Sequence, residues 1–141
     1  MTRIEEILTA LAAKLLETGV EVYRNQGLSI TINNLTSKGA LVLHDGDPGE
    51  PEQSFSPLTY HFEHSAELDM FVQGGDTHAK FDDLRTRIGL ALTSDRTLGG
   101  LVDWIEPQAP KPGDLPEMGT APIKAATITV VLHFASPDPL T

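Results

Sequence analysis

The sequence predicts an α+β domain: a mostly antiparallel or mixed sheet of about four to five strands with two helices packed on one face, plus long loops or β-arms. Two segments place apolar residues at helical spacing, one near the N-terminus and one after residue 76. Two longer segments, Thr59–Val72 and Ile123–Phe134, alternate apolar and polar residues, which is typical of strands with one buried face. Because 141 residues suit one hydrophobic core, we expect residues 1–141 to form a single domain.

The first predicted element is a helix over Thr2–Glu17. Thr2 and Glu5 have the spacing of a capping box, and Gly19 is the residue type that ends helices. Its apolar residues recur at helical spacing and predict the buried face: Ile4, Ile7, Leu8, Leu11, Leu15 and Leu16.

Short strands are expected next, over Val20–Tyr23, weakly over Leu28–Leu35, and over Ala40–His44. Residues 44–58 contain three prolines and two glycines, so we expect a long loop there. The loop leads into the segment Thr59–Val72.

The strand predicted over Thr59–Val72 is unusually long. It has 14 residues, whereas strands usually have about 5–6. A strand of this length extends beyond the sheet of a small domain, so its end must pair with another chain, curl, or fold into a hairpin arm. The predicted buried face carries Tyr60, Phe62, His64, Ala66, Leu68, Met70 and Val72, and the opposite face carries His61, Glu63, Ser65, Glu67, Asp69 and Phe71.

A second helix follows, and either Asp76 or Thr77 can cap its start. Its buried stripe is Phe81, Leu84, Ile88 and Leu92. The remaining predictions are a strand over Leu101–Ile105, with Trp104 in the core, a proline-rich loop over residues 106–122, the strand Ile123–Phe134, and a tail over residues 135–141.

The negative charge is concentrated in one segment. The net charge is −10, and residues 44–83 hold ten acidic residues against a single base, Lys80. A surface of this sign repels phosphate, so we expect no specific binding of nucleic acid. The chain has no cysteine, no apolar run long enough to cross a membrane, and no apolar signal-peptide core near Met1, so we expect cytoplasmic assembly and no membrane association.

No catalytic or metal site is predicted, and no cofactor. His61 and His64 are three residues apart on a strand and therefore face opposite sides, which prevents them from sharing an ion without distortion. Glu63, Glu67 and Asp69 follow simple alternation, which indicates a solvated strand face rather than paired catalytic carboxylates. The acidic loop after His44 has carboxylates that suit a hard cation, but its spacing fits no calcium loop and a solvated loop is the preferred interpretation.

The order of elements resembles the tail terminator family of long-tailed, siphovirus-type bacteriophages and prophage-derived particles. The resemblance rests on the helix Thr2–Glu17 followed at once by Val20–Tyr23, then the extended strand Tyr60–Val72, the helix His78–Leu92, and the strand Ile123–Phe134 with its Ser-Pro-Asp-Pro tail. It implies a structural virion protein without catalytic residues. Such proteins form a ring, typically a hexamer, that caps the tail tube, stops its polymerisation and provides the surface for head attachment.

The resemblance also implies partners: other copies of the chain, the tail tube protein and the head–tail connector, with DNA only passing through the ring. The implied location is the virion tail, assembled in the bacterial cytoplasm. Candidate interface residues are Tyr60, Phe62, Leu68, Phe71, Thr127, Thr129 and Val131. Candidate acidic residues of a lumen or rim are Asp45, Asp47, Glu50, Glu52, Glu63, Glu67 and Asp69.

Two other interpretations stay open at this point. One is a related virion part, either a head–tail joining protein or a tail tube subunit. The other belongs to a different class, a small cytoplasmic enzyme or ligand-binding domain that uses His61, Glu63 and His64.

Overall fold

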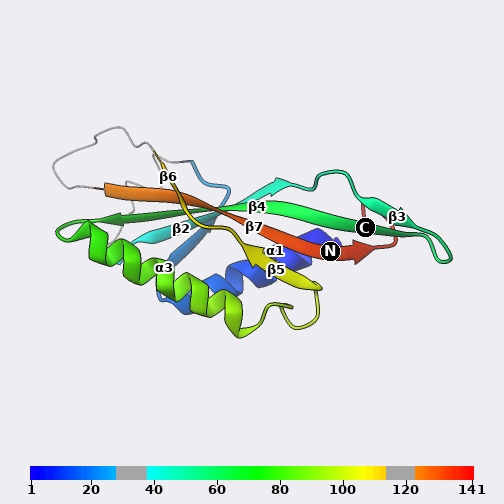
Figure 1. Ribbon diagram of the computed structural model, residues 1–141, viewed down its shortest axis with the longest axis horizontal. Helices are drawn as coiled ribbons and strands as arrows, with labels where there is room; N and C mark the ends of the chain where they lie inside the picture. Colours follow the sequence, from blue (N-terminus) through cyan, green and yellow to red (C-terminus); the bar gives the residue numbers. More distant parts are fainter. Residues whose placement is uncertain (28–37, 114–122) are drawn as a thin grey trace.

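The computed structural model describes residues 1–27, 38–113 and 123–141 of the chain. Within these residues, seven strands form one mixed sheet and two helices pack against it (Figure 1). The predicted α+β class and the helices against the sheet are confirmed. The sheet has more strands than expected because the short strands β3 and β6 lie inside segments that were predicted to be loops.

Helix α1 spans Arg3–Leu15 and continues as a 3-10 turn over Leu16–Thr18. The Glu5 amide donates to Thr2 Oγ1 at 3.3 Å, which satisfies one of the open donors of the first turn. Gly19 ends the helix in the left-handed conformation, with φ of 83°. The two signals predicted for the ends of this helix, Thr2 and Gly19, are therefore confirmed.

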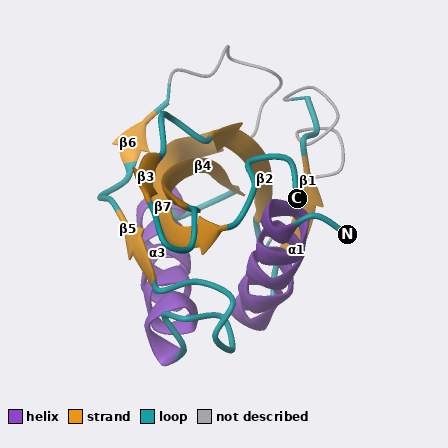
Figure 2. Cartoon of the chain, turned by 90° about the vertical axis from the view of Figure 1, so that its right-hand side faces the viewer, coloured by secondary structure: helices purple, strands orange, loops and turns teal. Residues whose placement is uncertain are grey.

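Helix α3 spans Thr77–Ser94 and buries the predicted stripe of Phe81, Leu84, Ile88 and Leu92. The predicted side-chain cap is wrong. Asp76 occupies the N-cap position in the left-handed conformation, and its side chain makes no capping hydrogen bond to the described part of the chain. In Figure 2 both helices lie on the same side of the sheet. Neither of these helices is long and apolar enough to span a membrane, and this finding covers the described residues alone.

β4 and β7 lie at the centre of the sheet. The strand order is β1-β2-β4-β7-β5, with β3 also paired to β4 and β6 also paired to β7. Their bounds are β1 Glu21–Arg24, β2 Ala40–Asp47, β3 Glu52–Ser54, β4 Thr59–Gln73, β5 Trp104–Pro107, β6 Lys111–Pro112 and β7 Ile123–Ser136. β1 and β2 are parallel, and the other pairs are antiparallel.

The length of β4 is explained within one chain. It pairs with β7 without interruption, from Tyr60 opposite Ser136 to Gln73 opposite Ile123. Its other edge is shared by β2 and β3, and β3 forms a hairpin with the start of β4. Of the three outcomes expected for this strand, the structure shows the hairpin arm, which reaches one end of the molecule in Figure 1.

Side chains alternate along the two long strands, so one set faces the core under the helices and the other set faces the open face, the side of the sheet away from both helices. Even-numbered side chains of β4 and β7 point to the helices and form the main core with Leu8, Leu11 and Ile88. A smaller buried cluster lies on the opposite face and consists of Ala40, Val42, Phe71 and Ala125.

Several predicted boundaries are wrong because β4 and β7 offer edges that short proline-containing segments can still pair with. Within the predicted loop 44–58, β2 continues to Asp47 and β3 forms; within 106–122, β5 continues to Pro107 and β6 forms. The strand expected over Leu101–Ile105 begins only at Trp104, and the tail expected from residue 135 begins after Ser136. The strand predicted over Leu28–Leu35, like residues 114–122, lies outside the described residues.

Candidate functional site

The candidate site is the open face of the sheet, on the side away from both helices. Odd-numbered residues of β4 point to this side because successive side chains of a strand alternate. Their cross-strand neighbours come from β7: Glu63 lies opposite His133, Ser65 opposite Val131, Glu67 opposite Thr129, and Asp69 opposite Thr127.

The acidic residues of this face divide into two kinds. The side chain of Glu63 is 79% exposed, and Glu67 is exposed as well. Asp69 is only 27% exposed, because its Oδ1 accepts from Thr127 Oγ1 at 2.7 Å and its Oδ2 accepts from His44 Nε2 at 2.9 Å. Asp69 therefore ties three neighbouring strands together. Glu67 and Glu63 remain exposed to a partner, although Glu63 Oε1 lies 3.9 Å from His133 Nδ1.

A cavity of about 260 Å³ opens beside Glu63 at the hairpin end of this face. Four carboxylates and two imidazoles are among its lining groups: Glu50, Glu52, Glu63, Asp103, His61 and His133. Such a lining favours a cationic group. In the described residues, however, no group of three or more histidine and acidic side chains is arranged to hold a metal ion.

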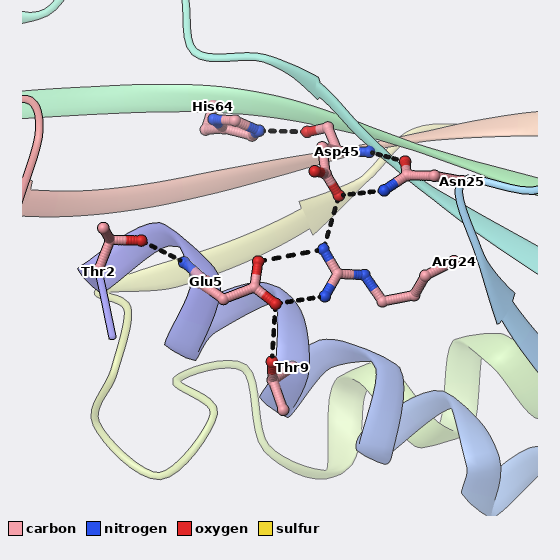
Figure 3. A network of polar contacts seen from close by, with 7 residues as sticks. All are labelled: Thr2, Glu5, Thr9, Arg24, Asn25, Asp45 and His64. Atoms are coloured by element: carbon pink, nitrogen blue, oxygen red, sulfur yellow. Dashed lines mark hydrogen bonds and ion pairs between the residues drawn. The ribbon is translucent and has the colours of Figure 1, made fainter.

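Asp45 differs from the other predicted rim acids because it is part of a polar network between α1, β1 and β2 (Figure 3). Its Oδ1 accepts from Arg24 Nη2 at 2.7 Å and from Asn25 Nδ2 at 3.1 Å. Arg24 also donates from Nη1 to Glu5 at 2.6 Å. These hydrogen bonds lower the pKa of Asp45 and of Glu5 below their usual ranges. Asp45 is thus paired with Arg24, which it shares with Glu5, and this internal pairing speaks against its predicted place on an acidic rim.

The predicted rim acids that remain exposed lie on three strands and one connection. Asp47, Glu50 and Glu52 lie at the end of β2, in the connection and on β3, and Glu63 and Glu67 lie on β4. Asp47 accepts from the Gly49 amide at 2.8 Å, which shapes the turn. Five exposed acids of residues 44–83 therefore lie on the hairpin and the open face, whereas Asp76, Asp82 and Asp83 belong to the start of α3.

Three of the predicted interface residues are core residues instead. Phe62 and Leu68 are buried on the helix-covered face, where Phe62 stacks on Phe134 with ring centres 5.2 Å apart. Phe71 lies on the open face but is buried in the smaller cluster. Side chains this deeply buried cannot form a subunit interface, and Phe62 is open only toward the cavities that it lines. These three assignments are therefore wrong for the folded chain. Tyr60, Thr127, Thr129 and Val131 are half-buried, and of these Thr127 is already bonded to Asp69.

Sequence analysis missed the exposed apolar residues. Phe55, 74% exposed, and Leu58 lie at the turn of the hairpin. Trp104, expected in the core, is 45% exposed on β5; Arg96 covers its ring at 4.8 Å, and its Nε1 donates to Glu106 at 2.7 Å. The turn signal Ser56-Pro57 could have identified Phe55 as a tip residue, but periodicity alone gives no such signal for Trp104.

The structure also separates the three residues of the enzyme interpretation. His61 and Glu63 point to the open face, but His64 is buried on the opposite face of the same strand. They form no common site. No protein-family model matches this chain, and no curated protein is similar to it in sequence.

Proposed function

We propose that this chain is a structural subunit of a phage tail terminator ring, which caps a tail tube and stops its polymerisation. The observation that carries the proposal is the two-sided sheet. Helices α1 and α3 cover one face, and the other face leaves Glu63 and Glu67 in solvent beside a hairpin with an apolar tip. A subunit with one helix-covered face, one acidic face and an extended arm suits a ring.

The proposed ring is a homo-oligomer, typically a hexamer, and its other partners are the tail tube protein and the head–tail connector. Its acidic residues would let DNA pass without adhering, since like charges repel. In this proposal the chain is not an enzyme, needs no cofactor, and acts in the virion tail after assembly in the bacterial cytoplasm. The hairpin tip with Phe55 and Leu58 is the proposed contact to a neighbouring subunit or to the tube, because exposed apolar side chains gathered at one tip favour association.

The test is to add the purified chain to polymerising tube protein from the same particle and to measure tube length by electron microscopy. We expect shorter tubes in proportion to the amount of chain added. A double variant, Phe55→Ser with Leu58→Ser, removes the apolar tip and should restore long tubes. The matched control is Leu90→Ser, which removes an exposed leucine from α3 and should leave the shortening intact.

Light scattering after size-exclusion chromatography separates the related virion roles. A closed ring from the chain alone, together with shortened tubes, supports a terminator. Spontaneous long tubes formed by the chain itself would instead identify a tube subunit. A ring that leaves tube length unchanged would point to a head–tail joining protein.

A further inference from the structure

A second cavity, on the other side of the sheet, lies between the start of α1, the strands β4 and β7, and the last residues of the described chain. Its volume is about 270 Å³. Most of its walls are apolar and include Ile4, Pro48, Phe62, Phe134 and Leu140. Its polar lining residues are Thr2, Arg3, His64, Ser136, Asp138 and Thr141. Among the described residues that line it, His64 is the one buried ionisable side chain, at 4% exposed.

The hydrogen bonding of His64 fixes which tautomer its neutral ring adopts. Its Nε2 is hydrogen-bonded to the main-chain carbonyl oxygen of Asp45 (Figure 3). A carbonyl oxygen only accepts, so Nε2 carries the hydrogen and, in the neutral ring, Nδ1 carries a lone pair. Asp45 is itself held by Arg24 and Asn25, and its amide donates to Asn25 Oδ1 at 3.1 Å. Because this carbonyl is held in place, the imidazole has little freedom to turn and direct Nδ1 instead of Nε2 to it.

The Nδ1 atom is an acceptor without a donor. It is buried, and within residues 1–27, 38–113 and 123–141 no hydrogen-bond partner reaches it. An acceptor that is buried without a hydrogen bond lowers the stability of the fold, and a ligand that donates to it would remove this cost. A mostly apolar cavity with a few polar groups in its wall, one of them a buried acceptor without a hydrogen bond, is typical of a site for a small, mostly apolar ligand.

We propose that this cavity binds a small aromatic group that carries one hydrogen-bond donor, with the donor directed to His64 Nδ1. An engineered cavity of about 150 Å³ accepts benzene, so a larger cavity of about 270 Å³ has room for a substituted ring. The stacked pair of Phe62 and Phe134, 17° apart in plane angle, supplies aromatic surface for such a ring. Phenols have this chemistry, whether as free molecules or as the side chain of a tyrosine. The inference does not depend on the proposed assembly of the chain into a terminator ring.

The test uses the full chain and two probes of nearly equal shape, p-cresol and p-xylene, which differ in one hydroxyl group. Titrations followed by NMR should give p-cresol an affinity about threefold to tenfold higher, the ratio expected for one neutral hydrogen bond. The ¹⁵N resonance of His64 Nδ1 should move with p-cresol only. Equal affinities, or no binding of either probe, would overturn the proposal.

A third probe, N-acetyl-tyrosine amide, distinguishes the two sources. Binding as tight as that of p-cresol indicates a site for a tyrosine side chain, and binding at least about tenfold weaker indicates a free phenol. His64→Leu should abolish the preference for p-cresol over p-xylene, with circular dichroism to confirm that it folds. The matched control, His61→Leu, changes an exposed histidine on the opposite face and should keep the preference; its loss there would contradict the proposal. If His64→Leu does not fold, the affinities of p-cresol and p-xylene for the unchanged chain still test whether the cavity prefers a ligand with a hydrogen-bond donor.

Discussion

Arg24 shows how a single side chain can hold three elements together. Its guanidinium bonds Glu5 of α1 at 2.6 Å and Asp45 of β2 at 2.7 Å, while its own main chain belongs to β1. Both carboxylates are about half exposed, so solvent weakens the pairing and its contribution to stability is modest. The network also holds the main chain of Asp45, the residue whose carbonyl orients His64.

Arg24→Met should lower the free energy of unfolding by about 1 kcal/mol near neutral pH, since methionine keeps the aliphatic stem but not the charge. Folding lowers the pKa of Glu5 and of Asp45 from ordinary values of 4.5 and 3.8. The stabilisation is therefore complete above those values and is lost as pH falls through the lower folded-state values. Urea unfolding at several pH values measures the difference, with exposed Arg85→Met as control. A difference that persists in strong acid would show that Arg24 acts through packing instead.

Asp69 and Glu67 provide a matched pair on the same face of β4. Asp69→Ala should lower the free energy of unfolding by about 1–3 kcal/mol, because it leaves the partly buried Thr127 and His44 groups without their acceptor. Glu67→Ala should change it by less than about 0.5 kcal/mol, as an exposed residue does. Thermal unfolding of both variants checks this, and equal losses would contradict the division into tied and available acids.

At the scale of elements, periodicity predicted the long features and failed at the short ones. Both helices and both long strands were predicted, because more than ten residues of amphipathic repeat outweigh local exceptions. β3 and β6 were missed, since strands this short exist only through the edge that β4 or β7 offers them. The burial of Phe71 depends on Ala40, Val42 and Ala125, which meet only in the folded sheet.

Gly46 sits where the pairing of β2 with β4 slips, between His44 and Asp47. Its φ is 78°, and an added Cβ would collide with the Ser65 carbonyl and lie 2.8 Å from Ala66 Cα. Gly46→Ala should therefore cost at least about 3 kcal/mol of stability. Gly89→Ala is the matched control: it lies within α3 with nothing within 4 Å of an added Cβ and should gain about 0.5–1 kcal/mol. Urea unfolding compares them, and a loss in both would contradict the steric argument.

At the scale of the whole molecule, the fold decides which of the predicted acids can act together. The acidic segment 44–83 was visible in the sequence, and the structure places most of its exposed carboxylates on the hairpin and the open face, with Asp82 and Asp83 on α3. Composition could not reveal that Asp45 is paired with Arg24 or Asp69 with His44, because those partners are 21 and 25 residues away in sequence. The hairpin and the open face together keep five exposed acids of this segment: Asp47, Glu50, Glu52, Glu63 and Glu67.

That charge distribution predicts how the chain should associate with its own copies. Acidic sides brought near one another repel, and salt screens the repulsion: the Debye length is about 30 Å at 0.01 M salt and about 8 Å at 0.15 M. Self-association measured by analytical ultracentrifugation should therefore strengthen at least about threefold between these salt concentrations. Glu63→Gln with Glu67→Gln should reduce this salt dependence, whereas Asp82→Asn with Asp83→Asn, the same charge change on α3, should reduce it less. Association that weakens with added salt would mean that attraction between opposite charges holds the copies together, which is incompatible with an acidic face turned to a shared lumen.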